Sequence, residues 1–507
     1  MAFEFLDPVI NLLPEVKKPA QKPEFKKRIM WVVAGILIFF VLGQISPLGL
    51  LTPAKLEEIR AENPAMYAQL AEEMEDVLGR VGFLERVHTI LASKIGSLAT
   101  LGIGPIVMSS IILQLLTGAE LLKIDKERYQ GVQKLFAILF CFFEAGIYVF
   151  SGFLPIMPSA VSLLPLPLIG GLFKLNHLLV LTQIAFGSII LLYLDEVISK
   201  YGFGSGIGLF IVAGVSQSII FRAFDPVAGL VPTFVTQMIT AGIMDLDLIA
   251  PLLFTIVVFL VVVYAEAMRI EIPLTLGRIR GVGGRYPLKF FYVSNLPVIL
   301  AAALFANVQL FSSVLNNLGF PLLGTFGPGG NPLPELVLSL NLSELSFPIA
   351  YLVQAPYGII GTSSAISQYI LNPTYTVLGV IPLELVHLFL YSIILVGVCV
   401  MFGMFWVETT GMGSSQVAEQ LQGVGFSVPG FRRDKRVIER VLDRYIPIIT
   451  ILGAGSVGLL AAFADITGAL GTGTGILLSV GILYRLYEEL AQSQLMDMHP
   501  ALKQFFG

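Results

Sequence analysis

Apolar runs of about 20 residues, the length that crosses the hydrocarbon core of a bilayer as a helix, alternate with short polar segments along the chain. Ten such runs lie approximately at residues 29–51, 95–117, 132–153, 176–195, 206–222, 248–267, 290–311, 384–407, 446–465 and 473–492. Two other apolar stretches, 154–173 and 349–371, are excluded because the first contains four prolines and the second many turn residues. The pattern predicts an all-α polytopic membrane protein with ten transmembrane helices, and nine or eleven are the alternative counts.

Composition agrees with a membrane protein. Hydrophobic residues make up 55% of the chain and charged residues only 13%, whereas soluble chains are about 25% charged. Both cysteines, Cys141 and Cys399, lie in apolar runs, which argues against a disulfide framework or a thiolate metal cluster. Residues 1–28 are polar and lack the features of a secretory signal peptide, so the first apolar run is expected to remain as a membrane anchor.

Lysine and arginine are distributed unevenly between the two sides of the predicted membrane. If the N-terminal segment is cytosolic, 24 of the 31 Lys and Arg residues fall on the inner side, as the positive-inside rule requires. No Lys or Arg occurs between Lys289 and Arg432, an interval that contains the loop at about 312–383. Cytosolic N- and C-termini and an external position for this loop are therefore predicted.

Ten spans indicate two halves of five, at residues 29–222 and 223–492, between a cytosolic N-terminal segment (1–28) and a cytosolic C-terminal tail (493–507). An odd number of spans in each half inverts the second half relative to the first, an arrangement that places a pathway at the interface between the halves. The repeat is not visible in residue identities, so the duplication is an architectural hypothesis.

Motifs of catalysis are missing from the sequence. The chain contains no HExxH, GxSxG or GxxxxGK[ST] sequence, and its four histidines are scattered, so a zinc protease, a serine hydrolase and a nucleotide-binding loop are not indicated. We predict no enzyme activity, no catalytic residue, no metal site and no cofactor.

Glycines cluster where three apolar runs begin, in LGIGPIV (101–107), GFGSGIGLFI (202–211) and GALGTGTGILL (468–478). Inside a helix Gly costs about 1 kcal/mol and Pro about 3 kcal/mol relative to Ala, so these positions mark breaks. In the first two sequences a pair of β-branched residues four positions apart shares one helix face. Close helix packing is one interpretation of these faces, and an apolar constriction is the other.

Several longer sequences carry a specific resemblance. They are LGIGPIV, QIAFGSIILLYLDEVISKYGFGSGIGLFI, YAEAMRIEIPL, GGRYPLKFFYVSNLPVILAAALFAN, FWVETTG and the run from GTGTGILL to LYRLYEEL. Together they closely resemble the archaeal SecY family, the large subunit of the Sec protein translocon, which is akin to eukaryotic Sec61 alpha. The resemblance covers nearly all ten spans and is weakest in 52–82 and 312–383. It implies a protein-conducting channel of two inverted five-helix halves.

A central ring of aliphatic side chains is a feature of this family. The resemblance places the ring at Ile103, Val107, Ile207, Ile211, Ile299 and Leu478. A narrow apolar constriction of this kind excludes water and so bars ions, while its flexible side chains can part around an extended polypeptide.

A short re-entrant plug helix beside the ring is also implied. By its position before LGIGP the plug is expected at 83–92, FLERVHTILA, which is too short and polar to span a membrane. Its apolar positions are Phe83, Leu84, Val87, Ile90 and Leu91. An ordinary external loop is the alternative, and the acidic segment before it, about 55–82, is expected to form an external helical insertion of open role.

Polar residues within spans are functional candidates. Glu144 lies within the third span and Asn295 opens the seventh. The resemblance assigns both to a polar cluster at a lateral gate, where the second, third, seventh and eighth spans part to admit a signal sequence. Met108 stands where the family often has a small polar residue, so Ser109 is the substitute candidate. A satisfied packing acid is the alternative for Glu144.

The resemblance implies that two basic cytosolic loops, at about 268–289 and 408–445, dock the ribosome. The candidate residues are Arg278, Arg280, Arg432 and Arg433. Contacts of such residues with rRNA phosphates confer an affinity that falls with salt, and an ordinary positive-inside flank is the alternative interpretation. The resemblance further implies small SecE-like and Sec61 beta/SecG-like membrane subunits, signal sequences, nascent polypeptides and membrane lipid as partners, in the plasma membrane.

Two other classes of protein stay open as alternatives. An ion-coupled secondary transporter is also built from inverted repeats with broken helices, but it needs several ionisable groups near the midplane, and Glu144 is the main one in this chain. A scaffold or insertase that never opens a through-pore would differ from a channel in its ion conductance.

Overall fold

The structure of this chain is a computed structural model, and it describes most of the sequence. The described residues are 7–19, 23–62, 67, 70–71, 92–118, 122, 126–150, 152–157, 175–227, 229–242, 244–273, 275–276, 285–317, 320, 322–323, 349–356, 358–359, 366, 370–371, 376–377, 381–424, 426–427 and 435–498.

Each of the ten expected spans corresponds to a helix. These are α2 (Phe25–Leu42), α6 (Gly104–Gly118), α7 (Lys126–Phe150), α8 (Leu175–Tyr201), α9 (Gly206–Phe224), α11 (Leu246–Ala267), α12 (Leu296–Asn317), α15 (Leu383–Thr409), α17 (Lys435–Thr467) and α18 (Gly473–Met498). Within the described residues seven of them are long and apolar enough to cross a membrane, namely α7, α8, α9, α11, α12, α15 and α17. The other three fall short because α6 is brief, because α2 carries three charges near its start and because α18 carries three charges near its middle.

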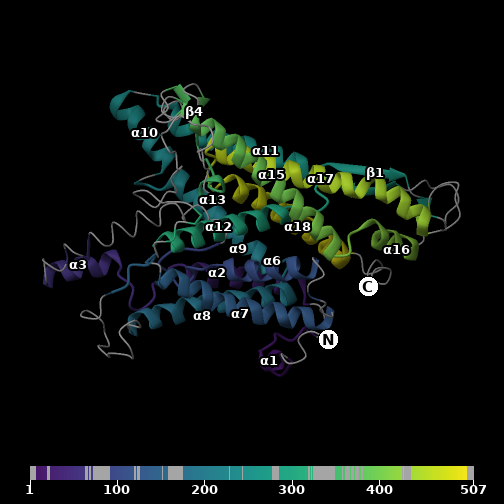
Figure 1. Cartoon of the computed structure of the whole chain (residues 1–507), viewed down its shortest axis with the longest axis horizontal. Coiled ribbons are helices and arrows are strands. Elements are labelled where there is room, and N and C mark those ends of the chain that lie inside the picture. The colour runs from purple at the N-terminus through teal and green to yellow at the C-terminus, as the bar shows by residue number, and fades with distance from the viewer. Residues whose placement is uncertain are drawn as a thin grey trace.

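The ten helices form two groups that pack face to face (Figure 1). One group holds α2 and α6 to α9, and the other holds α11, α12, α15, α17 and α18. The groups meet where α9 packs on α18 and where α6 packs on α12 and α15. The two groups coincide with the two halves expected from the order of the spans.

Shorter helices lie at the two ends of the molecule. At one end is α16 (Ser414–Val424), and at the other are α3 (Pro53–Glu62) and α10 (Leu230–Ala241), while α1 (Asp7–Leu12) lies beside α7 (Figure 1). A four-residue helix, α13 (Ile349–Leu352), lies beside α12 and α15. Within the described residues the excluded stretch 349–371 thus contains no long helix, as expected.

Three small sheets modify the all-helical expectation. β1 (Arg269–Pro273) pairs with β3 (Arg285–Lys289) as an antiparallel hairpin. Two other pairs are β2 (Thr275–Leu276) with β6 (Phe426–Ser427) and β4 (Thr376–Val377) with β5 (Ile381–Pro382). Because β2 and β6 come from the two predicted basic loops, this pairing joins the loops to each other.

The helix α17 begins at Lys435, about three turns earlier than the span expected at 446. Its added residues are amphipathic, and Ile438 and Leu442 pack in a cluster with Ile272, Leu288 and other residues of the basic loops. Arg436, Arg440 and Arg444, which belong to the second predicted basic loop, therefore lie on a helix that continues into the membrane span.

Tyr292 and Glu419, which lie near the basic loops, have pKa values that burial and ion pairing shift from the usual ones. Tyr292 donates its hydroxyl to the carbonyl oxygen of Met412 at 2.7 Å, and burial raises the pKa of this phenol to about 12. Glu419 of α16 pairs with Lys435 at 2.8 Å, and the hydrogen bond and charge of that ammonium lower the pKa of the Glu419 carboxyl. Tyr292 therefore stays a neutral donor, and Glu419 stays ionised, near neutral pH.

The segment before α6 is not helical, although a span from residue 95 was expected. Gly96 and Gly102 have φ angles of 79° and 56°, which a helix does not accommodate, and α6 starts only at Gly104. The segment crosses α8 so closely that a Cβ on Gly187 would lie 1.9 Å from the carbonyl oxygen of Leu98. The break in LGIGPIV thus marks the point where the non-helical segment that precedes α6 ends and the helix begins.

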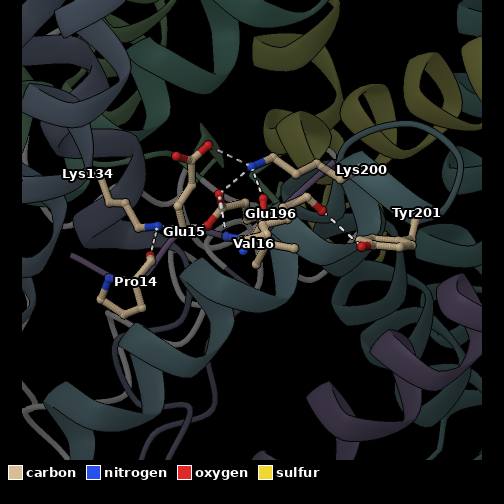
Figure 2. Close-up of polar contacts among 8 residues, drawn as sticks. Pro14, Glu15, Val16, Lys134, Glu196, Lys200 and Tyr201 are labelled. Atoms are coloured by element: carbon tan, nitrogen blue, oxygen red, sulfur yellow. Dashed lines mark hydrogen bonds and ion pairs between the residues drawn. The ribbon is translucent and has the colours of Figure 1, made fainter. Parts of the chain in front are cut away.

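The residues before α2 form an N-terminal strap (residues 7–19) that lies across the ends of α7 and α8 (Figure 2). Glu196 of α8 is at its centre, with Lys134 Nζ at 2.8 Å, Lys200 Nζ at 2.7 Å and the Val16 amide nitrogen at 3.3 Å. Lys134 also donates to the carbonyl oxygen of Pro14 at 2.6 Å. The two lysines therefore bind the strap and Glu196 at the same time.

Candidate pore and gate

The six residues expected to form a ring lie in one hydrophobic cluster. Ile103, Ile211 and Leu478 are fully buried, Val107 is buried, and Ile207 and Ile299 are partly buried against the same cluster. They come from both groups of helices, with Ile103 just before α6 and the others on α6, α9, α12 and α18. The two halves thus meet through aliphatic side chains.

A cavity of about 220 Å³ lies on one side of this cluster. Its apolar wall includes Val107, Ile207, Ile211 and Ile299, whereas Ile103 and Leu478 do not line it. Its polar wall consists of Ser110, Gln114, Gln133, Ser205, Ser294, Asn295 and Arg485. The cavity therefore ends on four of the six ring residues, and the rest of its wall combines apolar side chains such as Trp406 and Ile482 with neutral polar groups and one arginine.

A half-buried aspartate, Asp195, hydrogen-bonds to the glycine-rich start of α9. Asp195 Oδ1 accepts hydrogen bonds from the Ile207 amide nitrogen at 2.9 Å and from Ser205 Oγ at 3.3 Å. A Cβ on Gly206 would lie 2.6 Å from the Asp195 Cα. The carboxylate satisfies donors that a helix start leaves open, and the glycine lets α8 and α9 approach closely enough for this bond.

The entry of α18 repeats this arrangement. Asp465 Oδ1 accepts from the Gly473 amide nitrogen at 2.7 Å, and its Oδ2 accepts from the Tyr391 hydroxyl at 3.1 Å. A Cβ on Gly473 would lie 2.3 Å from the Ala461 carbonyl oxygen. The fifth and tenth spans thus both start at a glycine beside an aspartate of the preceding helix. The sequence interpretation missed both aspartates, although each lies just before one of the glycine clusters.

The three predicted gate residues occupy separate places. Glu144 is buried, and its Oε1 has no hydrogen-bond partner among the described residues. Ser109 donates to the Ile106 carbonyl oxygen of its own helix at 2.8 Å, and Asn295 Nδ2 donates to the Leu477 carbonyl oxygen of α18 at 3.0 Å. Among the described residues no hydrogen bond joins the three side chains into one cluster.

Depth in the membrane explains this separation. The Phe143 ring of α7 lies 6.3 Å from the Phe311 ring of α12, so Glu144 is level with the far part of α12. Asn295 precedes α12, 16 residues before Phe311, which corresponds to about 24 Å along a helix. The polar side chains that share the cavity with Asn295 are instead those of Ser110, Gln114 and Gln133, and polar amides inside apolar runs were the signal that could have found them.

The backbone that leads into α12 is constrained. Ser294 has a φ of 55°, a left-handed conformation that costs a non-glycine residue about 1–2 kcal/mol. Its amide nitrogen donates to the Phe291 carbonyl oxygen at 2.9 Å. The turn therefore fixes the direction in which Asn295 and α12 leave the β1–β3 hairpin.

The tips of the two basic loops lie outside the described residues. These tips contain the predicted docking residues Arg278, Arg280, Arg432 and Arg433. The plug candidates Phe83, Leu84, Val87, Ile90 and Leu91 also lie outside the described residues. The base of the first loop is described, and Arg269 and Lys289 both pair with Glu488 of α18, at 3.0 Å and 2.5 Å. Within the described residues no group of three or more His, Cys, Asp or Glu side chains is placed to hold a metal ion.

Known proteins share this architecture over the whole chain. The family model described as SecY matches residues 97–487. The protein translocase subunit SecY of Methanococcus vannielii is 41% identical over 508 residues, which cover 99% of each chain. That of Methanothermobacter thermautotrophicus is 42% identical, again over 99% of each chain.

Solved structures give the same result. A chain from a structure described as "The structure of a protein conducting channel" has a TM-score of 0.75 and 40% identity, over 97% of this chain and 98% of that one. A chain of "Sec61 in the Canine ribosome-channel complex from the endoplasmic reticulum" has a TM-score of 0.73 and 40% identity at the same coverage. This chain therefore belongs to the SecY family of multi-pass membrane proteins.

Proposed function

We propose that this chain is the central pore-forming subunit of a Sec translocon. It passes unfolded secretory polypeptides across the membrane and releases transmembrane segments sideways into the lipid. The observation that carries the proposal is the convergence of six aliphatic side chains, from both halves of the chain, in one cluster beside a cavity that four of them line. Its relatives are protein translocase subunits, which supports the same role.

The aliphatic cluster acts as the seal. A narrow apolar constriction loses its water and bars ions, and the side chains of Ile, Val and Leu can change rotamer to admit a polypeptide of any sequence. Because the ring residues come from both halves, separation of the halves widens the ring. No covalent chemistry is involved, and the energy for transport comes from a partner.

The halves part on the side of α6 and α7. There α6 packs on α12 and α15, and this boundary is the proposed lateral gate, with Glu144, Ser109 and Asn295 as its polar residues at different depths. On the opposite side α9 packs on α18, with Gly208 against Ile482. That contact serves as the hinge.

The plug is proposed at 83–92. Its last residue, Ala92, is buried in the same hydrophobic cluster as the ring residues, as is Ala99 of the following entry segment. The burial of Ala92 beside the ring residues supports a plug that closes the ring. A structure of a relative describes the plug domain of SecY as stabilising the closed channel, which supports this assignment.

The ribosome is the proposed partner on the face that holds α16, β1 and the start of α17. Arg278, Arg280, Arg432 and Arg433 are the proposed contacts with rRNA phosphates. The canine relative is a component of a ribosome-channel complex, in agreement with this. Small SecE-like and Sec61 beta/SecG-like subunits complete the proposed complex, and signal sequences, nascent polypeptides and lipid are its other partners.

The proposed location is the plasma membrane, with the N- and C-termini in the cytosol. α16 and the β1–β3 hairpin lie at one end of the molecule (Figure 1). Of the 31 Lys and Arg residues, 24 belong to the segments proposed to lie on the side of this end. The positive-inside rule assigns it to the cytosol.

Transport by the purified complex in liposomes tests the function. The complex is isolated with the small membrane subunits that accompany it, and a secretory precursor stalled on ribosomes is offered after reconstitution. Protection of the released precursor from external protease is expected. An ion flux that depends on a small solute, from the chain alone and without polypeptide transport, would instead establish the secondary transporter.

A further inference from the structure

The carboxyl group of Glu266 is buried but has no part in the pore as described so far. Glu266 lies in the last turn of α11 and is 3% exposed. Its Oε1 has no hydrogen-bond partner among the described residues. A buried polar atom without a partner is unfavourable, so a carboxyl group at this place calls for a functional account.

Gly481 of α18 brings Glu266 and Asn295 together. A Cβ on Gly481 would lie 1.7 Å from Asn295 Nδ2 and 2.6 Å from Glu266 Oε1. The two side chains therefore share the space that any side chain at position 481 would fill. Asn295 Nδ2 also donates to the Leu477 carbonyl oxygen at 3.0 Å. The Asn295 amide thus hydrogen-bonds to α18 and lies beside Glu266 of α11.

The position of Asn295 determines that of a ring residue. Asn295 lines the cavity, and its carbonyl oxygen accepts from the Ile299 amide nitrogen at 3.2 Å in the first turn of α12. The left-handed Ser294 fixes the backbone on the other side of Asn295. A shift of Asn295 that displaces its backbone is therefore passed to Ile299.

Charged side chains also surround Glu266. Arg485 and Lys289 are close enough to attract its carboxylate, whereas Glu488 repels it. Arg485 also lines the cavity. Glu266 itself does not line the cavity, whereas Asn295, Gly481 and Arg485 do. The carboxyl group therefore lies outside the layer of side chains that forms the cavity wall.

We propose that Glu266 is a positioning residue of the channel seal. Its carboxyl group holds the Asn295 side chain against α18 at Gly481 and so fixes the start of α12, which carries Ile299. The role rests on the proposed function, because it assigns Glu266 to the closed state of that pore. Loss of the carboxyl group lets the start of α12 move and opens a leak without removing any ring residue.

The test compares Glu266→Leu with Glu266→Gln in the reconstituted complex. Leucine fills a similar volume but offers no oxygen to the Asn295 amide, whereas glutamine keeps an oxygen in that place. The resting ion conductance is measured in the absence of substrate, together with the unfolding temperature. We expect the leucine variant to leak at least fivefold more than the parent and the glutamine variant to stay within twofold.

Two further variants separate positioning from general packing. Thr255→Val removes a buried contact of the same helix, in which Thr255 Oγ1 accepts from the Leu470 amide nitrogen at 2.7 Å, far from Asn295. It should lower the unfolding temperature without a leak. Gly481→Ala displaces both side chains and should leak like Glu266→Leu. Combining Glu266→Leu with Asn295→Leu should leak no more than the worse single variant.

A leucine variant as tight as the parent would overturn the positioning role, as would a Thr255→Val variant that leaks equally. If Glu266→Leu does not fold, a tight Gly481→Ala variant overturns it as well. The parent complex must transport the stalled precursor in the same liposomes. Failure of the parent to do so contradicts the proposed function, whereas transport by a parent whose variants stay tight contradicts only the role of Glu266.

Discussion

Single glycines and aspartates decide where the helices of this chain break. Asp195 and Asp465 satisfy the starts of α9 and α18, and the glycines beside them permit the close approach. The glycine clusters were visible in the sequence as breaks. Their aspartate partners were not, because a carboxylate near the end of an apolar run is equally typical of a solvated helix end. Only the fold shows that these carboxylates point at the following helix.

A methyl group at Gly187 should destabilise the protein. Gly187→Ala would place a Cβ 1.9 Å from the Leu98 carbonyl oxygen, so the entry segment must move away from α8. Overpacking of this kind costs about 1–3 kcal/mol, and the unfolding temperature of the purified complex measures it. Gly397→Ala is the matched control, since a Cβ there meets nothing within 4 Å. Equal unfolding temperatures for the two variants would disprove the tight crossing.

Removal of the Asp465 carboxylate should cost stability. Asp465→Ala leaves the Gly473 amide and the Tyr391 hydroxyl without their acceptor in a buried place, at about 1–3 kcal/mol for an unsatisfied group. Asp195→Ala removes the equivalent contact in the other half and should cost less, because Asp195 is less buried. Thermal unfolding measures both. A larger loss for Asp195→Ala would contradict the ranking.

At the scale of elements, hydropathy located all ten helices but not their ends. The start of α6 is displaced because two glycines with positive φ hold the entry segment out of the helix. The start of α17 is extended because Ile438 and Leu442 bury against the basic loops. Both shifts depend on tertiary contacts, and a pattern of apolar residues contains no information about them. The same holds for the β1–β3 hairpin, whose pairing links residues 12 or more positions apart.

The N-terminal strap should come loose when Glu196 is replaced. Glu196→Ala removes the acceptor shared by Lys134, Lys200 and the Val16 amide. We expect faster cleavage within residues 14–18 by a lysine-specific protease, by about fivefold. Glu24→Ala, which removes an exposed ion pair with Lys27, is the control and should leave the cleavage rate unchanged. A strap that stays protected in Glu196→Ala would show that other contacts hold it.

At the scale of the molecule, the two groups of helices agree with the arrangement expected from the sequence. The six predicted ring residues share one cluster between these groups, and their role as a seal stays a prediction. The polar gate was less predictable. Glu144 and Asn295 looked equivalent as polar residues in apolar runs, but the register of α7 against α12 places them at different depths. Register between helices is a property of the whole fold, so residue type alone could not reveal it.

Ribosome binding should depend on both basic loops, which β2 and β6 join. Arg280→Glu and Arg432→Glu should each weaken binding and flatten its salt dependence, because each removes about one phosphate contact and about one unit of slope in log K against log salt. Co-sedimentation with ribosomes at several salt concentrations measures this. Arg222→Glu, at the opposite end of the span α9, is the control. An unchanged salt slope in the loop variants would reject the docking assignment.

The most direct measurement asks what the translocating chain touches. A photoreactive side chain is placed at Ile299, on the ring, or at Leu260 of α11, which is 60% exposed on the outer surface. A secretory chain stalled in the middle of transport is then irradiated. We expect crosslinks to Ile299 and none to Leu260. Transport with no crosslink at Ile299, or with equal crosslinks at both positions, would contradict a pore through the aliphatic ring.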